Sequence, residues 1–179
     1  MYDPLDLRPG ALETADNPNS LTDETEPLHR FGGLIYHSAP FEEAEISGNA
    51  RLVAWIAMDL PDTDFEVNLY EMLPNGGSVL TGDSLRAHYR ESARKPSPVD
   101  PGQIVKYDFR GFTWFSRRMA KGSRLRLMLR SPNSIGVEKN YNSGVMANES
   151  GKDARTAHIS LYHDAEHASY LELPIVGKR

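Results

Sequence analysis

The chain has no cysteine among its 179 residues. This absence excludes disulfide bonds, thiol nucleophiles and metal sites built on thiolates. No apolar run approaches the ~20 residues that a membrane-spanning helix needs. The first residues, MYDPLDLRPG, lack the basic and apolar regions of a signal peptide. The sequence therefore predicts a soluble, cytoplasmic protein with no membrane partner.

An excess of basic charge is also missing, since 20 basic and 25 acidic residues give a net charge of −5. The charge is uneven, because residues 31–85 hold nine acids and one arginine, whereas residues 86–130 hold twelve bases and three acids. The basic segment has two interpretations, a phosphate-binding patch or basic strands paired with acidic ones. Because residues 31–179 are neutral overall, we favour paired strands and expect no nucleic-acid partner.

Residues 1–30 differ from the rest of the chain. They hold seven acids, two arginines and four of the twelve prolines, with neither a helical nor a strand-like apolar period. This composition predicts an extended arm that is disordered or lies on a partner. We therefore divide the chain into an acidic, proline-rich arm over 1–30 and a domain over 31–179.

From residue 31 the apolar period is two, as in strands. Residues 52–58 are apolar at successive positions, which predicts a central strand covered on both faces. Residues 65–69 alternate, which predicts one wet face, and Pro74-Asn75-Gly76-Gly77 is typical of a hairpin turn. Further alternating segments are expected at 79–90, 104–109, 124–130, 158–162 and 170–175.

The pattern contains no convincing long amphipathic helix. Six or more short strands separated by turn signals predict an all-β protein, an antiparallel sandwich or barrel. We also expect the first and last strands to lie close together, as in jelly rolls.

Nucleophilic catalysis finds little support in the sequence. Gly82-Asp83-Ser84-Leu85-Arg86 is the nearest match to a G-x-S-x-G elbow, but it lacks the second glycine and lies between strand patterns. A triad assembled from distant residues stays open, although nothing selects its members.

Two segments could bind metals. His163 and His167 are four residues apart, which suits a metal on a helix, but the segment lies between strands and favours a loop held by local hydrogen bonds. Asp59, Asp62 and Asp64 could supply oxygen ligands for calcium, or they could cap a tight loop ahead of a strand. We favour the structural interpretation in both places and predict no metal and no cofactor.

Three aromatic side chains, Phe112, Trp114 and Phe115, lie close together in the sequence. Exposed, they could stack on a sugar or a partner protein, and buried, they would belong to the core. We expect at least two of them to be buried.

The order of several short motifs resembles the C-terminal domain of the X-Pro dipeptidyl-peptidase (peptidase S15) and cocaine esterase (CocE/NonD) family. No single motif is specific, but the collinear set covers nearly the whole chain. The motifs are Tyr2-Asp3-Pro4, Asp62-Thr63-Asp64-Phe65, Leu85-Arg86-Ala87, Tyr89-Arg90, Pro101-Gly102, Lys121-Gly122, Arg124-Leu125, Ser131-Pro132-Asn133, Asn140 with Asn142-Ser143-Gly144, Tyr162-His163-Asp164, Glu166-His167 and Leu171 to Pro174.

The resemblance implies a jelly-roll β-sandwich, similar in fold to galactose-binding domains. In that family the domain follows an α/β-hydrolase domain and a helical cap, and the catalytic serine, aspartate and histidine belong to the hydrolase domain. The resemblance thus implies no catalytic residue in this chain. It also implies that Tyr2-Asp3-Pro4 marks the point where the chain leaves the hydrolase domain.

Two positions depart from the family pattern. Ser123 stands where many members carry histidine, and Lys139-Asn140 replaces an arginine–asparagine pair, which removes a bidentate donor. Contacts inherited at these two points are therefore in doubt, whereas the fold is not.

Two functions follow as hypotheses. The first is an accessory domain that packs on an α/β-hydrolase domain, in the same or a separate chain, and shapes its active-site entrance. The second is a free-standing module that binds a carbohydrate or another small ligand. Its candidate ligand-binding residues are Trp114, Phe115, Asn140, Tyr141 and Asn142. A homo-oligomer is a further possible assembly.

Overall fold

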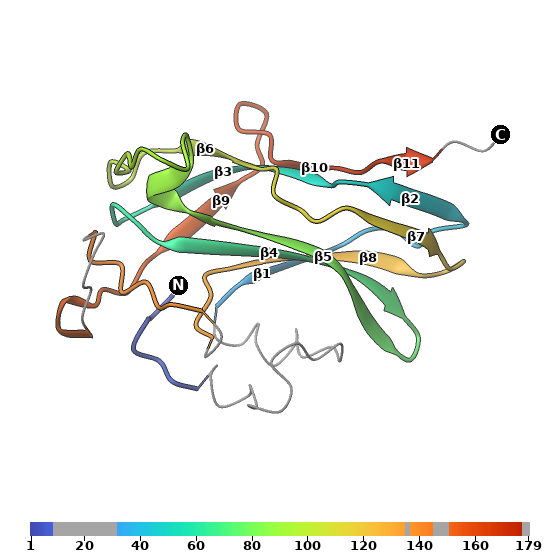
Figure 1. Ribbon diagram of the computed structural model, residues 1–179, viewed down its shortest axis with the longest axis horizontal. Helices are drawn as coiled ribbons and strands as arrows, with labels where there is room; N and C mark the ends of the chain where they lie inside the picture. The colour runs from blue at the N-terminus through green and yellow to red at the C-terminus, as the bar shows by residue number, and fades with distance from the viewer. Residues whose placement is uncertain (9–31, 135–136, 145–150, 177–179) are drawn as a thin grey trace.

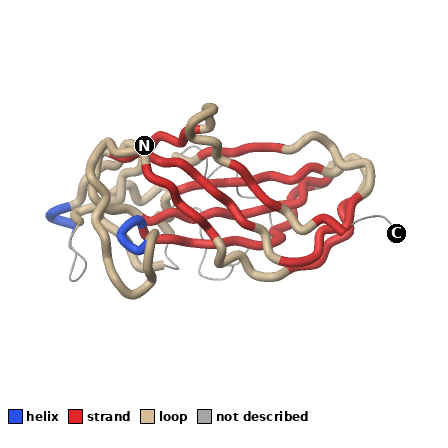
Figure 2. The backbone as a smooth tube through the Cα atoms, turned by 90° about the horizontal axis from the view of Figure 1, so that it is seen from above, coloured by secondary structure: helices blue, strands red, loops and turns tan. Residues whose placement is uncertain are grey.

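A computed structural model describes residues 1–8, 32–134, 137–144 and 151–176 of the chain (Figure 1). These residues form eleven β-strands and two short 3-10 turns, η2 (Ala87–Tyr89) and η3 (Gly151–Asp153), with no α-helix among them (Figure 2). The strands lie in two layers, and the N-terminus and the last strand, β11 (Ile175–Val176), lie toward opposite ends of the long axis (Figure 1). Within the described residues no helix is long and apolar enough to cross a membrane.

The first layer is a four-stranded antiparallel sheet in the order β1-β8-β4-β5. Its strands are β1 (Leu34–His37), β8 (Arg124–Arg130), β4 (Asp64–Leu73) and β5 (Gly76–Arg86). The predicted turn at 74–77 joins β4 to β5, which pair from Leu73 opposite Gly76 to Asp64 opposite Arg86. The prediction of a hairpin at this position is confirmed.

The second layer consists of two short antiparallel sheets, and short loops connect the strands of one sheet to those of the other. One has β3 (Arg51–Met58) between β6 (Val105–Phe109) and β10 (Tyr170–Glu172), with β9 (Ile159–Tyr162) also paired to β3. The other has β2 (Ala44–Gly48) between β7 (Phe115–Met119) and β11 (Ile175–Val176). Only a few residues separate β2 from β3, β6 from β7 and β10 from β11. The two sheets therefore lie end to end, and the layer is long and narrow (Figure 1).

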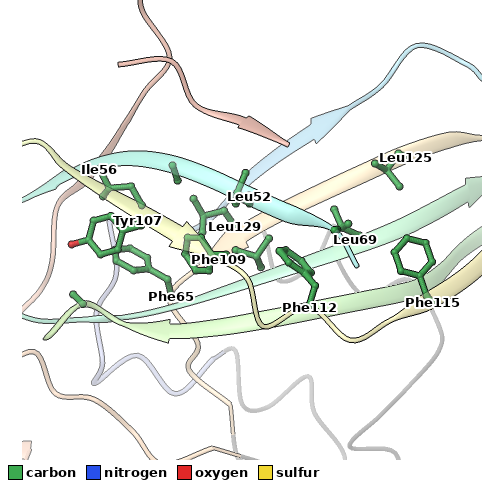
Figure 3. Close-up of a cluster of buried hydrophobic side chains, with 14 of the residues drawn as sticks. Leu52, Ile56, Phe65, Leu69, Tyr107, Phe109, Phe112, Phe115, Leu125 and Leu129 are labelled. Carbon is green, nitrogen blue, oxygen red and sulfur yellow. The ribbon is translucent and has the colours of Figure 1, made fainter. Parts of the chain in front are cut away.

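Strand β3 is the central strand of its sheet, as its apolar sequence predicts. It pairs with β6 on one side and with β9 and β10 on the other. Side chains from both layers meet between the sheets to form one core, which includes Ile56, Phe65, Tyr107 and Phe109 (Figure 3). The all-β antiparallel sandwich is therefore confirmed, whereas the jelly-roll and galactose-binding-like details stay predictions.

The alternation predicted through residues 79–90 is wrong at its end. Strand β5 stops at Arg86, and residues 87–89 form η2 instead. The backbone N–H of Ala87 donates to the carbonyl of Thr63, and that of His88 donates to the side chain of Asp62. These bonds turn the backbone away from the sheet, which apolar periodicity cannot reveal.

The interpretation of the charge pattern as paired strands is confirmed. Arg86 on β5 bonds to Asp64 on β4, and Arg130 on β8 bonds to Glu66 on β4. In the second layer Arg51 on β3 bonds to Asp108 on β6. Arg86 and Arg130 of the basic segment therefore pair with acidic residues of β4, whereas in the pair of the second layer the basic segment supplies the acid, Asp108.

One ion pair joins the two layers. Glu71 on β4 is fully buried, and its carboxylate accepts hydrogen bonds from Nε of Arg117 on β7 at 2.6 Å and from the N–H of Ala120 at 3.0 Å. Burial by itself raises the pKa of Glu71, but these two donors outweigh it and hold the pKa below its usual value of 4.5. The ionised carboxylate therefore stabilises the packing of β7 on β4.

Two of the three neighbouring aromatic side chains belong to the core, as expected. Phe112 and Phe115 are buried, whereas Trp114 between them is 59% exposed. Trp114 lies in the loop ahead of β7, whereas Phe115 is the first residue of that strand and faces the core.

Residues 9–30 of the predicted arm lie outside the described residues. Its first eight residues are described, and they bond to loops at one end of the sandwich.

We predict that Glu71→Gln lowers the free energy of unfolding by about 2 kcal/mol at neutral pH, because a charge-assisted bond inside the protein is lost. A depressed native pKa contributes stability above the unfolded pKa and loses it as the pH falls through the native pKa. The difference between wild type and variant should therefore shrink below pH 4.5. Denaturant unfolding at several pH values measures it.

Glu42→Gln is the matched control, because Glu42 pairs with Lys121 while 88% exposed. It should leave the stability unchanged at every pH tested. Equal pH profiles for Glu71→Gln and wild type would contradict the assigned role of Glu71.

Candidate functional site

A buried carboxylate, Asp62, lies in the loop between β3 and β4. It is 2% exposed and is bonded by two other segments of the chain. The backbone N–H of His88 donates to Oδ1 at 2.9 Å, and Nδ1 of the same residue lies 2.8 Å from Oδ1. The amide of Asn140 donates to Oδ2 at 3.1 Å. Three loops are therefore joined at one carboxylate.

Burial raises the pKa of Asp62, and the bonds from His88 and Asn140 act in the opposite direction. The partners supply the hydrogen bonds that the carboxylate loses on leaving water, without which its burial would be very costly. The residues around Asp62 therefore hold one another in place.

The loop that carries Asn140 is itself fixed by asparagine side chains. The amide nitrogen of Asn140 also donates to Asp64 at 3.0 Å, and its oxygen accepts from the backbone N–H of Asn142 at 2.8 Å. Asn142 donates to the carbonyl of Arg155 at 2.8 Å. It has a φ of 61°, a left-handed conformation that asparagine tolerates better than most residues. Both asparagines are buried and serve the fold.

The first residues of the chain are attached to this cluster. Tyr2 is 5% exposed and exchanges two backbone hydrogen bonds of 2.8 Å with Ala157, just before β9. Its hydroxyl donates to the carbonyl of Asn140 at 3.3 Å. The amide of Asn133 donates to the carbonyls of Asp3 and Asp6. The beginning of the chain is thus an integral part of the sandwich.

The same segment presents apolar side chains to the solvent. Met1 is 73% exposed, Leu5 55% and Leu7 74%. The side chains of Leu5 and Tyr141 both lie against Gly151, so they approach each other at this end of the sandwich. We call Met1, Leu5, Leu7 and Tyr141 the entry patch.

The structure does not bring the five predicted ligand-binding residues together. Asn140, Tyr141 and Asn142 lie beside Asp62, beyond the end of β3, whereas Phe115 pairs with Gly48, ahead of its start. Strand β3 is eight residues long, or about 25 Å, and it separates the two groups. Phe115, Asn140 and Asn142 are also buried, which leaves Trp114 and Tyr141 accessible.

Of the two histidines considered as metal ligands, His167 has structural contacts. The ring of His167 packs edge-on against Trp55 with centroids 5.3 Å apart, and its Nδ1 lies 3.2 Å from Asp164. His163 is exposed on the same loop. In the described part of the chain no three histidine or carboxylate side chains are grouped as metal ligands.

The other two chemical motifs are also placed. Ser84 lies inside β5, paired with Glu66 on β4, so it is not on a strand-to-helix elbow. Asp59 accepts hydrogen bonds from the backbone and ring of His158, and Asp62 accepts those described above. Both acids therefore fix loops, as the structural interpretation expects.

Sequence reasoning missed the contribution of His88 and Asn133 to this end of the molecule. His88 was expected on a strand, and Asn133 appeared only within a motif of the family resemblance. Both residues are polar and lie in segments rich in turn-forming residues. This pattern predicts a loop, but it does not predict which residue the polar side chain bonds to.

A sequence model described as the X-Pro dipeptidyl-peptidase C-terminal non-catalytic domain matches residues 4–172. The chain belongs to this family. The match includes the segment after Tyr2 and every loop that bonds to Asp62. The polar cluster is therefore part of the non-catalytic domain itself, and the family resemblance inferred from the motifs is confirmed.

One curated relative is the cocaine esterase of Rhodococcus sp. (strain MB1 Bresler). It is 26% identical over 185 residues, which cover 99% of this chain and 32% of the esterase. The non-catalytic domain thus spans about a third of the length of that relative.

Two solved structures show the same fold. An aminopeptidase from a marine sediment archaeon, Thaumarchaeota archaeon, has a TM-score of 0.77 and 19% identity, covering 88% of this chain and 28% of its own. An α-amino acid ester hydrolase has a TM-score of 0.78 and 23% identity, covering 87% of this chain and 28% of its own. The sandwich is thus found as a minor part of longer chains.

We predict that Asn140→Ala lowers the free energy of unfolding by about 2–3 kcal/mol, because it leaves buried Asp62 with fewer donors. Urea unfolding measures the change. Gln103→Ala is the control, since it removes an amide from an exposed loop position and should alter stability by less than about 0.5 kcal/mol. Equal stabilities of the two variants would show that the cluster is not needed for the fold.

Proposed function

We propose that this domain packs on an α/β-hydrolase catalytic domain, in the same polypeptide or a separate one, and shapes the entrance to its active site. The hydrolase domain carries the hydrolysis of esters, amides or X-Pro peptides. The observation that carries the proposal is the entry patch, in which apolar side chains are exposed on a segment that the sandwich holds rigidly.

Rigidity and exposure together support an interface. The backbone bonds of Tyr2 with Ala157 and the bonds of Asn133 to Asp3 and Asp6 fix the segment from both sides. Leu5 and Leu7 nevertheless point into solvent. Exposed apolar groups gathered on one surface are typical of sites that another protein covers, and a preordered segment loses little entropy on binding.

The position of the patch agrees with the order of domains in the family. In the resemblance, the hydrolase domain precedes this one, and Tyr2-Asp3-Pro4 corresponds to the point where the chain leaves it. Met1, Leu5 and Leu7 of the entry patch flank this motif in the sequence, and Leu5 lies near Tyr141 at Gly151. In this proposal the chain divides into an acidic, proline-rich arm over 1–30 and a domain over 31–179, and the first residues of the arm, which the sandwich holds, present their exposed side chains to the hydrolase domain.

We predict that the double variant Leu5→Ala, Leu7→Ala weakens association with the cognate hydrolase domain, supplied as a separate polypeptide, by at least tenfold. Burying a leucine contributes about 1.5–3 kcal/mol, and 1.4 kcal/mol corresponds to a factor of ten. Calorimetric titration measures the dissociation constant, and ester turnover by the mixture reports the effect on activity.

Trp114→Ala is the matched control, because it removes a 59% exposed apolar side chain from the opposite end of the sandwich. It should leave association unchanged. Equal affinities for wild type and the double leucine variant, or a loss confined to Trp114→Ala, would place the interface elsewhere and refute the proposed role of the entry patch.

The second hypothesis, a free-standing module for a carbohydrate or small ligand, is supported by one observation, the exposed ring of Trp114. Such a ring can stack on the apolar face of a sugar. Phe115, Asn140 and Asn142 do not extend that site, because they are buried. This function stays a prediction.

For this module we predict that Trp114→Ala abolishes binding on a glycan array, whereas Tyr170→Ala, which removes a 43% exposed ring, does not. Glycan binding that survives Trp114→Ala would exclude Trp114 as the binding residue.

A further inference from the structure

The two layers of the sandwich do not close along one side. Strand β1 is the edge of the first sheet, and β9 and β10 together form an edge of the second. A cavity of about 420 Å³ opens between these edges, and residues from β1, β3, β8, β9 and β10 line it. The first and last parts of the sandwich thus face each other across a gap.

The walls of this cavity are aliphatic. Leu125, Leu127 and Leu129 of β8 form one side, and Leu161 and Leu171 lie on the other. Alternate residues of a strand point to the same face, so the three leucines of β8 lie in a row. From Leu125 to Leu129 the row is about 13 Å long. The cavity is therefore an elongated apolar slot along β8.

Its size sets it apart from ordinary packing defects. Protein interiors contain few voids larger than a water molecule. An apolar cavity of about 150 Å³ already binds benzene, and pockets for small molecules range from about 300 to 1,000 Å³. A slot of this volume and lining suits a flexible aliphatic molecule.

Polar side chains also line the cavity: Tyr36, His37, Ser38, His163, Ser169 and Tyr170. Tyr36 pairs with Leu127, so its side chain is on the cavity side of β1, and it is 39% exposed. His163 also lines the cavity and is exposed. Over the described ranges, neither the Tyr36 hydroxyl nor the His163 ring has a hydrogen-bond partner in the protein. Both can donate to a head group at the mouth.

We propose that this slot binds an aliphatic carboxylic acid, with the chain between the leucines and the carboxylate at Tyr36 and His163. A carboxylate is the head group that gains most from such donors, because hydrogen bonds to an ionised acceptor are stronger than neutral ones. The site does not depend on a hydrolase partner.

The test is calorimetric titration of the 179-residue chain with a homologous series from hexanoate to tetradecanoate. Each methylene that enters the slot contributes about 0.8 kcal/mol, so affinity should rise about fourfold per carbon. It should then stop rising once the slot is full. No saturable binding at any length would overturn the proposal.

Variants locate the site. Leu127→Phe fills the slot and should abolish binding, whereas Leu80→Phe, the same change at a partly buried leucine outside the cavity, should not. Tyr36→Phe should weaken the acids about fivefold and leave the corresponding alcohols less affected. Thermal unfolding verifies that each variant is folded. Binding that Leu127→Phe leaves intact, with the variant folded, also overturns the proposal.

Discussion

The structure depends at one end on a buried carboxylate. Asp62 cannot be ionised inside the protein without donors, and the chain supplies them from two remote loops, through His88 and Asn140. Because both donors must lie within hydrogen-bond distance of this carboxylate, the positions of three loops are fixed relative to one another. They are the loop after β3, the turn after β5 and the loop that carries Asn140. The same constraint ends β5 at Arg86 and holds the carbonyl of Asn140 toward Tyr2.

This constraint connects the fold to the proposed function. Tyr2 is anchored through Asn140 and Ala157, and the residues after it are held by Asn133. An apolar side chain such as Leu5 is therefore presented from a fixed backbone while 55% exposed. The far end of the sandwich is organised differently, around Glu71 and its bonds to β7, and there the ion pair serves packing between the layers.

Much of this could be read from the sequence. The double-faced apolar run at 52–58 predicted central β3, the turn at 74–77 predicted the β4–β5 hairpin, and the charge imbalance predicted ion pairs between strands. The structure does not place Trp114 and Asn140 in one binding site, because they lie near opposite ends of β3. Residue type alone does not show at which end of the sandwich a loop residue lies. The sequence also does not predict the slot beside β1. The alternation of apolar and polar residues shows which side chains point inward, but not whether side chains of the opposite layer fill the space between the sheets.

The central claim is that the first residues belong to the sandwich and are held by the Asp62 cluster. The most direct measurement is amide hydrogen exchange by NMR at Tyr2 and Ala157, which donate to each other's carbonyls. Our account predicts that both amides exchange as slowly as those of β3 and that Asn140→Ala accelerates Tyr2 selectively. Exchange of Tyr2 at the rate of an unstructured peptide in the wild-type chain would contradict it.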